Sequence, residues 1–360
     1  MNYLYLCSSI RHAYLAMGIA NDAPEANHHL IFINQKNAKD NHTVQLFLKD
    51  KRPFASIEVY ENGKGVIGKY QSKRAAFTQL KAALQRLQPH KIFGGNDRRT
   101  EFQFAMHFCH QLKKSKLVDY TPTGIYMDDG TGSYVNGVYL NKLQTITDLT
   151  IDRALKKLFY GLWYDKSMLM GGSKWVDECW LTFPDLAPEN LNKTIVPLKP
   201  ATFRSKSFLS LAERYLPTTK QASDSDGRDD IFSKKYDAFL ILPYSKFVKT
   251  YFPSSEVYVE LANKYLEKFD NIAVKYHPRE KDFYFKSSAN ITEFPPSIPA
   301  EVIFSFVSAN CVVGDLSSAL LSANWLLPES ESILLCPEKL ADHTLIQIFK
   351  RTPISIEYYA

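Results

Sequence analysis

The sequence predicts an α/β protein of two domains, each a parallel sheet wound with helices, and three observations support this. The chain has 360 residues, roughly twice the length of a typical domain. Short apolar runs alternate with amphipathic stretches, as in sheets built from strand–helix–strand units. The polar stretch 218–230 has no apolar anchors, and after it the same alternation starts again.

The first part of the chain contains the elements of one wound sheet. Apolar residues at helical spacing, followed by Pro89, predict a helix over 73–87. The same spacing predicts helices over 10–20 and 101–114. Strands are expected at 2–9, 29–35, 43–49, 90–97 and 123–127. Residues at about 150–215 are helical, aromatic and lysine-rich and then interrupted by prolines, which indicates a helical insertion.

The second part of the chain repeats the pattern. A helix is expected at 256–269, a short helical segment at 300–308, and a strand, turn and helix over 310–326. Further strands are expected at 237–245, 271–280 and 331–337, the last of them closing the sheet. We therefore expect domains at 1–228 and 236–360.

Composition and charge exclude several classes of protein. Apolar residues make up 45% and charged residues 23% of the chain, the balance of a globular protein. The net charge is +6, and no basic run is dense enough to predict nucleic-acid binding. Residues 1–235 carry 33 basic and 23 acidic side chains, whereas 236–360 carry 11 and 15. The first domain is thus expected to meet an anion, although an unbalanced solvated surface explains the division equally well.

Cysteine usage and hydropathy predict the compartment. The 5 cysteines are widely spaced and form no C-x-x-C pair, which argues against a disulfide framework and a zinc site. The first residues lack the basic region of a signal peptide. No uncharged apolar run approaches the roughly 18 residues that span a bilayer. We therefore expect a cytoplasmic protein.

An acidic pair follows the strand 123–127 and begins a glycine-containing turn, Asp128-Asp129-Gly130. In open α/β sheets ligands bind beyond the carboxyl ends of the strands. Two adjacent carboxylates there can supply a general base whose pKa is raised by its neighbour. An ordinary turn fits the same residues, and a metal site would need a third ligand that the spacing does not provide.

Three polar clusters end strands of the second domain in the same way. Lys275 and His277-Pro278 follow the strand that begins at 271, and a histidine there can donate to a phosphate. Ser317-Ser318 opens an apolar helix, where hydroxyl and backbone N–H groups can hold an anion, although a simple serine cap fits equally well. Glu301 lies on the same rim and could accept hydrogen bonds from ribose hydroxyls.

Taken together and in this order, the four clusters resemble the signatures of the bacterial sialyltransferases. These include the capsular polysialyltransferases and the family-52 lipooligosaccharide sialyltransferases. The acidic pair with its glycine, the His-Pro dipeptide and the serine pair match, and 294–304 looks like the segment whose glutamate holds the cytidine ribose. The resemblance covers residues 125–325. It implies a GT-B fold, in which two Rossmann-like doubly wound domains face each other across a cleft.

The resemblance also implies an inverting transfer from a CMP-sialic acid donor, with no metal and no further cofactor. Asp128 would remove the proton of the acceptor hydroxyl, with Asp129 assisting it. His277 would hydrogen-bond the CMP phosphate and act as the acid. Ser317 and Ser318 would hold that phosphate, Glu301 the ribose, and Lys275, Pro278 and Gly130 would complete the site. The product would be a surface polysaccharide or lipooligosaccharide.

A lysine- and aromatic-rich stretch at 153–175 contains Lys156, Lys157, Trp163 and Lys166. It is interpreted in three ways: a packed helical hairpin with a basic edge, a groove for an anionic glycan or glycolipid acceptor, or a peripheral contact with the inner face of the cell membrane. Two alternatives to the sialyltransferase hypothesis remain at this point. One is a CDP-glycerol glycerophosphotransferase or Kdo transferase of the same fold, and the other is a non-catalytic nucleotide- or glycan-binding protein.

Overall fold

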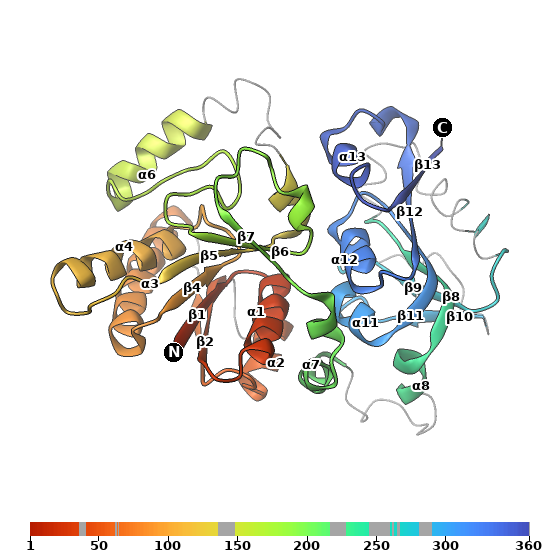
Figure 1. Ribbon diagram of the computed structural model, residues 1–360, viewed down its shortest axis with the longest axis horizontal. Helices are drawn as coiled ribbons and strands as arrows, with labels where there is room; N and C mark the ends of the chain where they lie inside the picture. Colours follow the sequence, from red (N-terminus) through yellow and green to blue (C-terminus); the bar gives the residue numbers. More distant parts are fainter. Residues whose placement is uncertain are drawn as a thin grey trace. The chain divides into compact units, whose positions relative to one another are not determined.

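The computed structural model describes residues 1–360 except 36–40, 62, 64, 136–147, 217–227, 245–259, 261–262, 265–266, 281–289 and 360. The chain divides into two compact units, Met1–Thr202 and Phe203–Ala360. Each unit contains one parallel sheet with helices along it (Figure 1). This confirms the predicted fold class of two Rossmann-like units in one chain.

The first unit is built on a sheet of seven parallel strands in the order β3-β2-β1-β4-β5-β6-β7. The strands are β1 (Asn2–Cys7), β2 (Asn27–Gln35), β3 (Ser56–Glu61), β4 (Lys91–Gly94), β5 (Thr123–Met127), β6 (Glu178–Leu181) and β7 (Thr194–Pro197). The helices are α1 (Ile10–Asp22), α2 (His42–Lys49), α3 (Gly65–Leu87), α4 (Thr100–Lys114) and α6 (Arg153–Tyr160). The central strands β1, β4 and β5 are almost wholly buried because a parallel sheet is covered on both faces.

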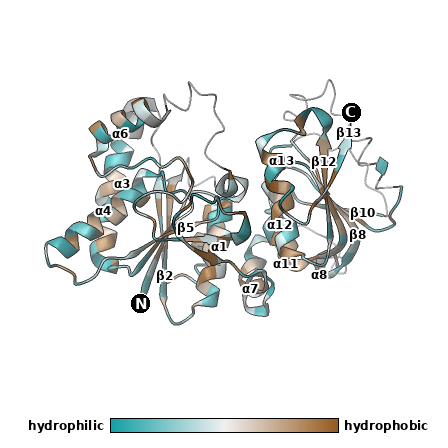
Figure 2. Ribbon diagram, turned by 45° about the horizontal axis from the view of Figure 1, so that its top comes forward, coloured by the Kyte–Doolittle hydropathy of each residue, from teal (hydrophilic) through white to brown (hydrophobic). Residues whose placement is uncertain are grey.

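The second unit is built on a sheet of six parallel strands in the order β10-β9-β8-β11-β12-β13. The strands are β8 (Lys235–Ile241), β9 (Ile272–Lys275), β10 (Ile291–Phe294), β11 (Ser308–Gly314), β12 (Glu331–Pro337) and β13 (Ser355–Tyr359). The helices are α7 (Lys206–Ala212), α8 (Arg228–Ser233), α11 (Ala300–Phe306), α12 (Ser318–Leu326) and α13 (Thr344–Phe349). Every second residue of the inner strands lines one core, and Figure 2 shows hydrophobic colour along these strands.

Residues 43–49, expected as a strand, form helix α2. The side chain of Asn41 accepts a hydrogen bond from the Val44 amide and so caps the helix. Val44 and Phe47, one turn apart, are the buried residues of this helix. The apolar residues of this short run fit a period of two as well as a period of three, and the capping residue decides between them.

Five short strands lie outside the sequence expectations, among them β10, which lies between β9 and α11. β3 follows α2, and β6 and β7 lie within the stretch expected to be helical, at its proline-rich end. β13 adds a strand beyond β12, which had been expected to be the last.

All five cysteines are free and buried. Within the described residues, no helix is long and apolar enough to cross a membrane.

The boundary between the units lies after Thr202, upstream of the expected 228. The Phe203 ring packs against Trp325 of α12 at 5.0 Å between centroids. Arg204 Nη1 donates to the carbonyl oxygens of Phe304 at 2.6 Å and Val307 at 3.0 Å. These are carbonyls at the end of α11 that lack helical partners, so a guanidinium there is stabilising. Most of the expected linker and most of the helix expected at 256–269 lie outside the described residues.

Each sheet has a point where the chain reverses the direction in which it adds strands. In the first sheet this point lies between β1 and β4, and in the second between β8 and β11. The helices that follow the two flanking strands leave on opposite faces of the sheet there, which opens a crevice beyond the carboxyl ends. Residues directly after β1, β4, β8 and β11 are therefore the ones positioned to contact ligands.

Candidate functional site

The acidic pair Asp128-Asp129 follows β5, at the carboxyl edge of the first sheet. The chain turns sharply at Gly130, whose φ of 79° lies in the left-handed region that glycine adopts without strain. A 3₁₀ turn, Gly130–Tyr134, follows. The turn directs the two neighbouring carboxylates into different surroundings.

Asp128 is fully buried, with 0% of its surface exposed. Its Oδ1 accepts a hydrogen bond from the Gly130 amide at 2.6 Å. Its Oδ2 accepts from the Thr182 amide at 3.0 Å and from the hydroxyls of Tyr134 and Thr182. Arg11 Nη2 lies 3.6 Å from Oδ1. Asp128 therefore joins the end of β5 to the chain after β6, with both carboxylate oxygens engaged.

Asp129 lies in a more open position, with 34% of its side chain exposed. Its Oδ1 lies 2.7 Å from Nε2 of His12, a residue of α1. The Asp129 amide donates to the Ser133 hydroxyl at 2.9 Å, and this hydroxyl in turn donates to Asp128 Oδ1 at 3.0 Å. A general base must come within hydrogen-bond distance of its proton. This geometry favours Asp129 over Asp128 for that role, the reverse of the sequence hypothesis.

In the second unit, His277 follows β9. Its Nδ1 accepts from the Arg279 amide at 3.1 Å, and its ring stacks on Tyr244, which follows β8, at 5.1 Å between centroids. Because a backbone amide can only donate, Nδ1 is the unprotonated nitrogen and Nε2 carries the proton. Burial, reinforced by Arg279 and Lys275, lowers the pKa of the His277 imidazole below its ordinary value. His277 thus presents a neutral N–H donor.

Glu301, Ser318 and Ser322 lie together in the second unit. Glu301 is in the first turn of α11, and Ser318 is the first residue of α12. The Ser322 hydroxyl lies 2.9 Å from the Ser318 carbonyl and 3.3 Å from Glu301 Oε1. The structure therefore brings the predicted ribose contact and the predicted phosphate contact to one place, beside the β8/β11 crevice.

Ser317 is the N-cap residue of α12, yet its hydroxyl makes no capping bond to the helix. Among the described residues its oxygen is buried without a hydrogen-bond partner, and burial raises the pKa of the Asp315 carboxyl, two residues before it, to about 6. The simple serine cap considered from the sequence is therefore not what the hydroxyl does.

Lys275 and Pro278 flank His277 but differ in what they can contact. The Lys275 side chain is 97% buried, and its Nζ donates to the carbonyls of Tyr276 at 2.8 Å and Pro296 at 3.0 Å. Burial lowers the pKa of this ammonium to about 8, against the attraction of Glu301. Lys275 thus ties β9 to the segment before α11, whereas Pro278 lies in the turn that presents His277.

The lysine- and aromatic-rich stretch divides into two parts. Lys166 is buried, and its Nζ lies 2.8 Å from Asp152; Trp163 packs on Phe104 and His107. In α6, by contrast, no side chain is buried, and Lys156 Nζ pairs with Asp152, four residues before it, at 3.0 Å. The apolar residues of α6 and its flanks point outward: Ile151, Leu155, Leu158, Phe159 and Leu162 are 48% to 84% exposed.

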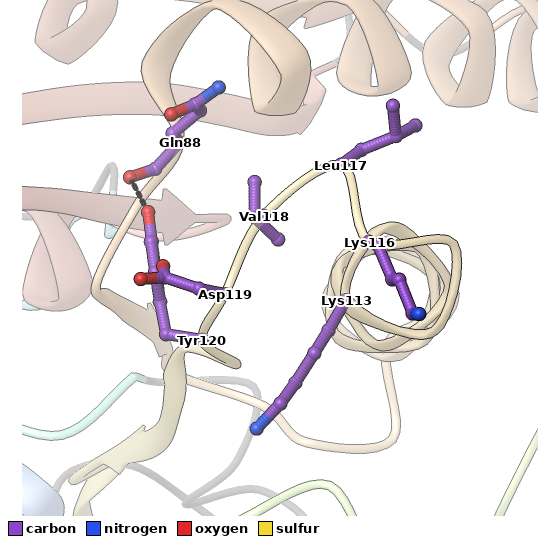
Figure 3. Close-up of a pocket in the computed structure, with 7 residues that line it drawn as sticks. All are labelled: Gln88, Lys113, Lys116, Leu117, Val118, Asp119 and Tyr120. Carbon is purple, nitrogen blue, oxygen red and sulfur yellow. Dashed lines mark hydrogen bonds between the residues drawn. The ribbon is translucent and has the colours of Figure 1, made fainter.

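A cavity of about 520 Å³ opens elsewhere on the first unit (Figure 3). Its lining includes Gln88, which precedes β4, and Tyr120, which precedes β5, and the Tyr120 hydroxyl donates to the Gln88 carbonyl. These residues lie at the amino ends of the strands. The cavity is therefore at the edge of the sheet opposite the acidic pair and is not a candidate for the nucleotide site.

Sequence reasoning missed His12, Tyr134 and Thr182. His12 is the third residue of α1, just after the serine pair that follows β1, so the switch point of the first sheet was a usable signal. Tyr134 and Thr182 carry no such signal, because β6 had not been recognised and the contact of Thr182 with Asp128 spans 54 residues.

Comparison with known proteins decides the family. The family model for alpha-2,8-polysialyltransferase matches residues 3–335. The chain belongs to this family. The predicted resemblance to bacterial sialyltransferases is thereby confirmed. Membership and the two Rossmann-like units together identify a glycosyltransferase of the sialyltransferase type with a GT-B fold.

Other comparisons give only distant likenesses. No curated protein matches significantly. The glycosyltransferase SnogD from Streptomyces nogalater is 9% identical, with 99% of this chain and 87% of that chain covered and a TM-score of 0.49. Arabidopsis thaliana UGT89C1 complexed with UDP-L-rhamnose is 11% identical, with 99% and 85% covered and a TM-score of 0.47. E. coli ADP-heptose lps heptosyltransferase II is 11% identical, with 100% and 90% covered and a TM-score of 0.41.

Proposed function

We propose that this polysialyltransferase-family chain moves sialic acid, or a related nonulosonic acid, from its CMP-activated donor to a glycan acceptor with inversion. The single observation that carries the donor assignment is the cluster of Glu301, Ser318 and Ser322 beside the β8/β11 crevice. A carboxylate for ribose hydroxyls and a helix start with hydroxyls for phosphate are the two contacts that a nucleoside monophosphate requires.

The donor groups suit the departure of CMP. The bond between the sugar and the phosphate breaks with both electrons going to the phosphate oxygen, so negative charge grows there. Donors fixed before the reaction stabilise such charge without reorganising. His277 supplies its Nε2–H for this purpose, and the hydroxyls of Ser317 and Ser318 add to it. No metal ion and no further cofactor enter this proposal.

The acceptor is activated by the acidic pair of the first unit. We assign the base to Asp129, which is 34% exposed, and assign to Asp128 the task of holding the turn in place. The acceptor hydroxyl gives its proton to Asp129 as its oxygen bonds to the anomeric carbon. Gly130 serves the same site by allowing the turn.

Among possible acceptors, an anionic glycan suits this chain best. The basic excess of the chain falls entirely within residues 1–235, which contain the acidic pair. The family description names an alpha-2,8-polysialyltransferase, and a polymer of sialic acid is an anionic glycan. Surface polysaccharide or lipooligosaccharide synthesis is the corresponding role, and we place it in the cytoplasm at the inner face of the cell membrane, with α6 as the contacting element.

Ligand binding tests the donor assignment. Thermal shift and calorimetry should show stabilisation by CMP over CDP, UDP and GDP, because a ligand that binds only the folded state raises its stability. The His277→Ala variant should lose CMP affinity and transfer rate. The matched control is His343→Ala, since the ring of His343 also accepts a bond from an amide two residues on, at the start of α13. Preference for CDP would instead favour a glycerophosphotransferase, and CMP binding without transfer to any glycan would indicate a binding protein.

A further inference from the structure

We propose that His12 is a positioning residue that holds the carboxylate of Asp129 in the orientation needed to receive the acceptor proton. This inference rests on the function proposed above, in which Asp129 is the base. His12 itself touches neither the donor nor the acceptor in this account. Its role is exerted through the Asp129 side chain.

The contact is short and enclosed. His12 Nε2 lies 2.7 Å from Asp129 Oδ1, and the His12 side chain is 2% exposed. The pair joins α1 to the turn after β5 across 117 residues of sequence. Among the described residues, His12 is the only side chain recorded as a partner of the Asp129 carboxylate. Its removal therefore leaves that carboxylate without its orienting contact.

The contacts of the second ring nitrogen of His12 determine which group donates the hydrogen bond between His12 and Asp129. Nδ1 of His12 lies 3.4 Å from the Ser8 amide nitrogen and 3.4 Å from the Ser8 hydroxyl. Because the amide can only donate, Nδ1 acts as the acceptor, and the ring proton is on Nε2. His12 therefore donates to Asp129.

The ring has space only because a glycine lies against it. A Cβ built on Gly95 would lie 2.2 Å from the His12 Nε2 and Cδ2 atoms, closer than side chains ever approach. Gly95 directly follows β4, and His12 lies in the first turn of α1, which follows β1. The pair therefore lies at the β1/β4 switch point, where wound sheets bind ligands. A residue that served only to join α1 to the sheet would not need to lie at this switch point.

The proton balance of the step shows what His12 contributes. The acceptor O–H bond breaks, its proton goes to an Asp129 oxygen, and the freed electron pair forms the new bond to the anomeric carbon. The donor's bond to phosphate breaks at the same carbon, and CMP departs with that electron pair. His12 exchanges no proton in this sequence. It keeps its Nε2–H bond and so fixes the rotamer of Asp129 throughout.

Two variants separate positioning from packing. His12→Phe keeps a planar ring but has no donor, whereas His12→Gln places an amide N–H close to the position of Nε2. We expect His12→Phe to lower kcat by about 10- to 100-fold with donor KM and CMP affinity unchanged, the usual size of an effect acting through an orienting contact. His12→Gln should recover most of that loss. Gly95→Ala, which displaces the ring, should behave like His12→Phe.

The matched control is His28→Phe. His28 is equally buried in the same unit and bonds to Tyr5 and the Ala23 carbonyl, at the opposite end of the sheet. Its loss should lower the thermal stability without changing kcat. Equal kcat losses in His12→Phe and His28→Phe, or equal losses in His12→Phe and His12→Gln, would overturn the proposal.

A measurement without turnover separates this proposal from the proposed function. The ring ¹⁵N NMR signals of His12 in the full chain should show Nε2 protonated, and Asp129→Asn should shift them. An Nε2 without a proton, or signals that Asp129→Asn leaves unchanged, would overturn the positioning role. If the NMR result is as expected and yet no sugar is transferred from a CMP donor, the donor assignment fails while the His12–Asp129 contact stands.

Discussion

At the scale of single residues, the acidic pair shows how adjacent identical side chains acquire different chemistry. The sequence predicts both carboxylates at a strand end, but the turn at Gly130 decides which of them is buried. Asp128 receives hydrogen bonds from two separate parts of the chain and an ion-pair contact from Arg11, and Asp129 receives a hydrogen bond from His12. Contacts between residues so far apart in sequence depend on packing, which no local pattern contains.

Substituting the pair should separate stability from rate. Asp128→Asn places an amide N–H₂ against groups that themselves donate, and unmatched buried polar groups are costly. We expect its free energy of unfolding to fall by about 3 kcal/mol. Asp129→Asn should leave the unfolding transition in place while transfer is lost and CMP still binds. Urea denaturation and kcat, measured on both variants, check this; full activity in Asp129→Asn would contradict the assignment.

The carboxyl of the half-buried Asp315 predicts a pH dependence of stability. Its pKa of about 6 in the folded chain exceeds the ordinary value of 3.8, so between these pH values the folded state binds more protons than the unfolded state. The free energy of unfolding should therefore decrease as pH rises through this window, by at most about 1.4 kcal/mol per pH unit.

Asp315→Asn should remove this contribution. Denaturation curves from pH 4 to pH 7 compare the two proteins, and identical slopes would contradict the prediction. CMP affinity followed over the same range reports whether an ionised Asp315 opposes phosphate binding near Ser317.

At the scale of elements, the sequence predicts long helices and buried strands well and short elements poorly. The helices at α3 and α4 extend over many turns, so their period is unambiguous. β6 and β7 have four residues each, too few to establish a period, and they lie in a stretch rich in prolines and aromatic residues. α2 shows the same ambiguity, resolved only by the Asn41 cap.

Helix α6 presents its apolar side to solvent, which predicts membrane binding. Leu158 and Phe159 are 79% and 62% exposed, with basic residues on the same helix. Such a helix binds at the surface of anionic bilayers. Leu158→Asp with Phe159→Asp should reduce co-sedimentation with phosphatidylglycerol vesicles and leave the melting temperature unchanged.

The control for this experiment is Leu117→Asp, because Leu117 is 67% exposed near the cavity of Figure 3 and remote from α6 in sequence. Equal vesicle binding by the wild type and the α6 variant would contradict the membrane contact.

At the scale of the whole molecule, the alternation of elements predicts two wound sheets, and both are present. The sequence also indicates the strand ends that carry His277 and the serine pair, whereas β10, the strand before Glu301, was not expected. It could not place the unit boundary, because the polar stretch near 218–230 is more conspicuous than the junction at Thr202. The true junction is defined by contacts of Phe203 and Arg204 with α12 and the end of α11, which are separated from them by about a hundred residues.

The boundary predicts which fragment folds. A fragment of residues 203–360 retains the bonds from Arg204 to the end of α11 and should unfold cooperatively and bind CMP. A fragment of residues 236–360 leaves those carbonyls without the guanidinium and exposes the surface of Trp325. Circular dichroism and calorimetry on both fragments check this; equal stability of the two would contradict the boundary.

The position of Arg204 also bears on how such enzymes can be recombined. The second unit can be exchanged between related transferases. It then keeps Arg204, whose guanidinium caps α11, only if the two sequences are joined before residue 203. An alignment would instead suggest joining the sequences within the polar stretch 218–230. A junction there separates α11 from its own Arg204. Chimeras joined at the two positions should therefore differ in yield, although both preserve every strand of the second sheet.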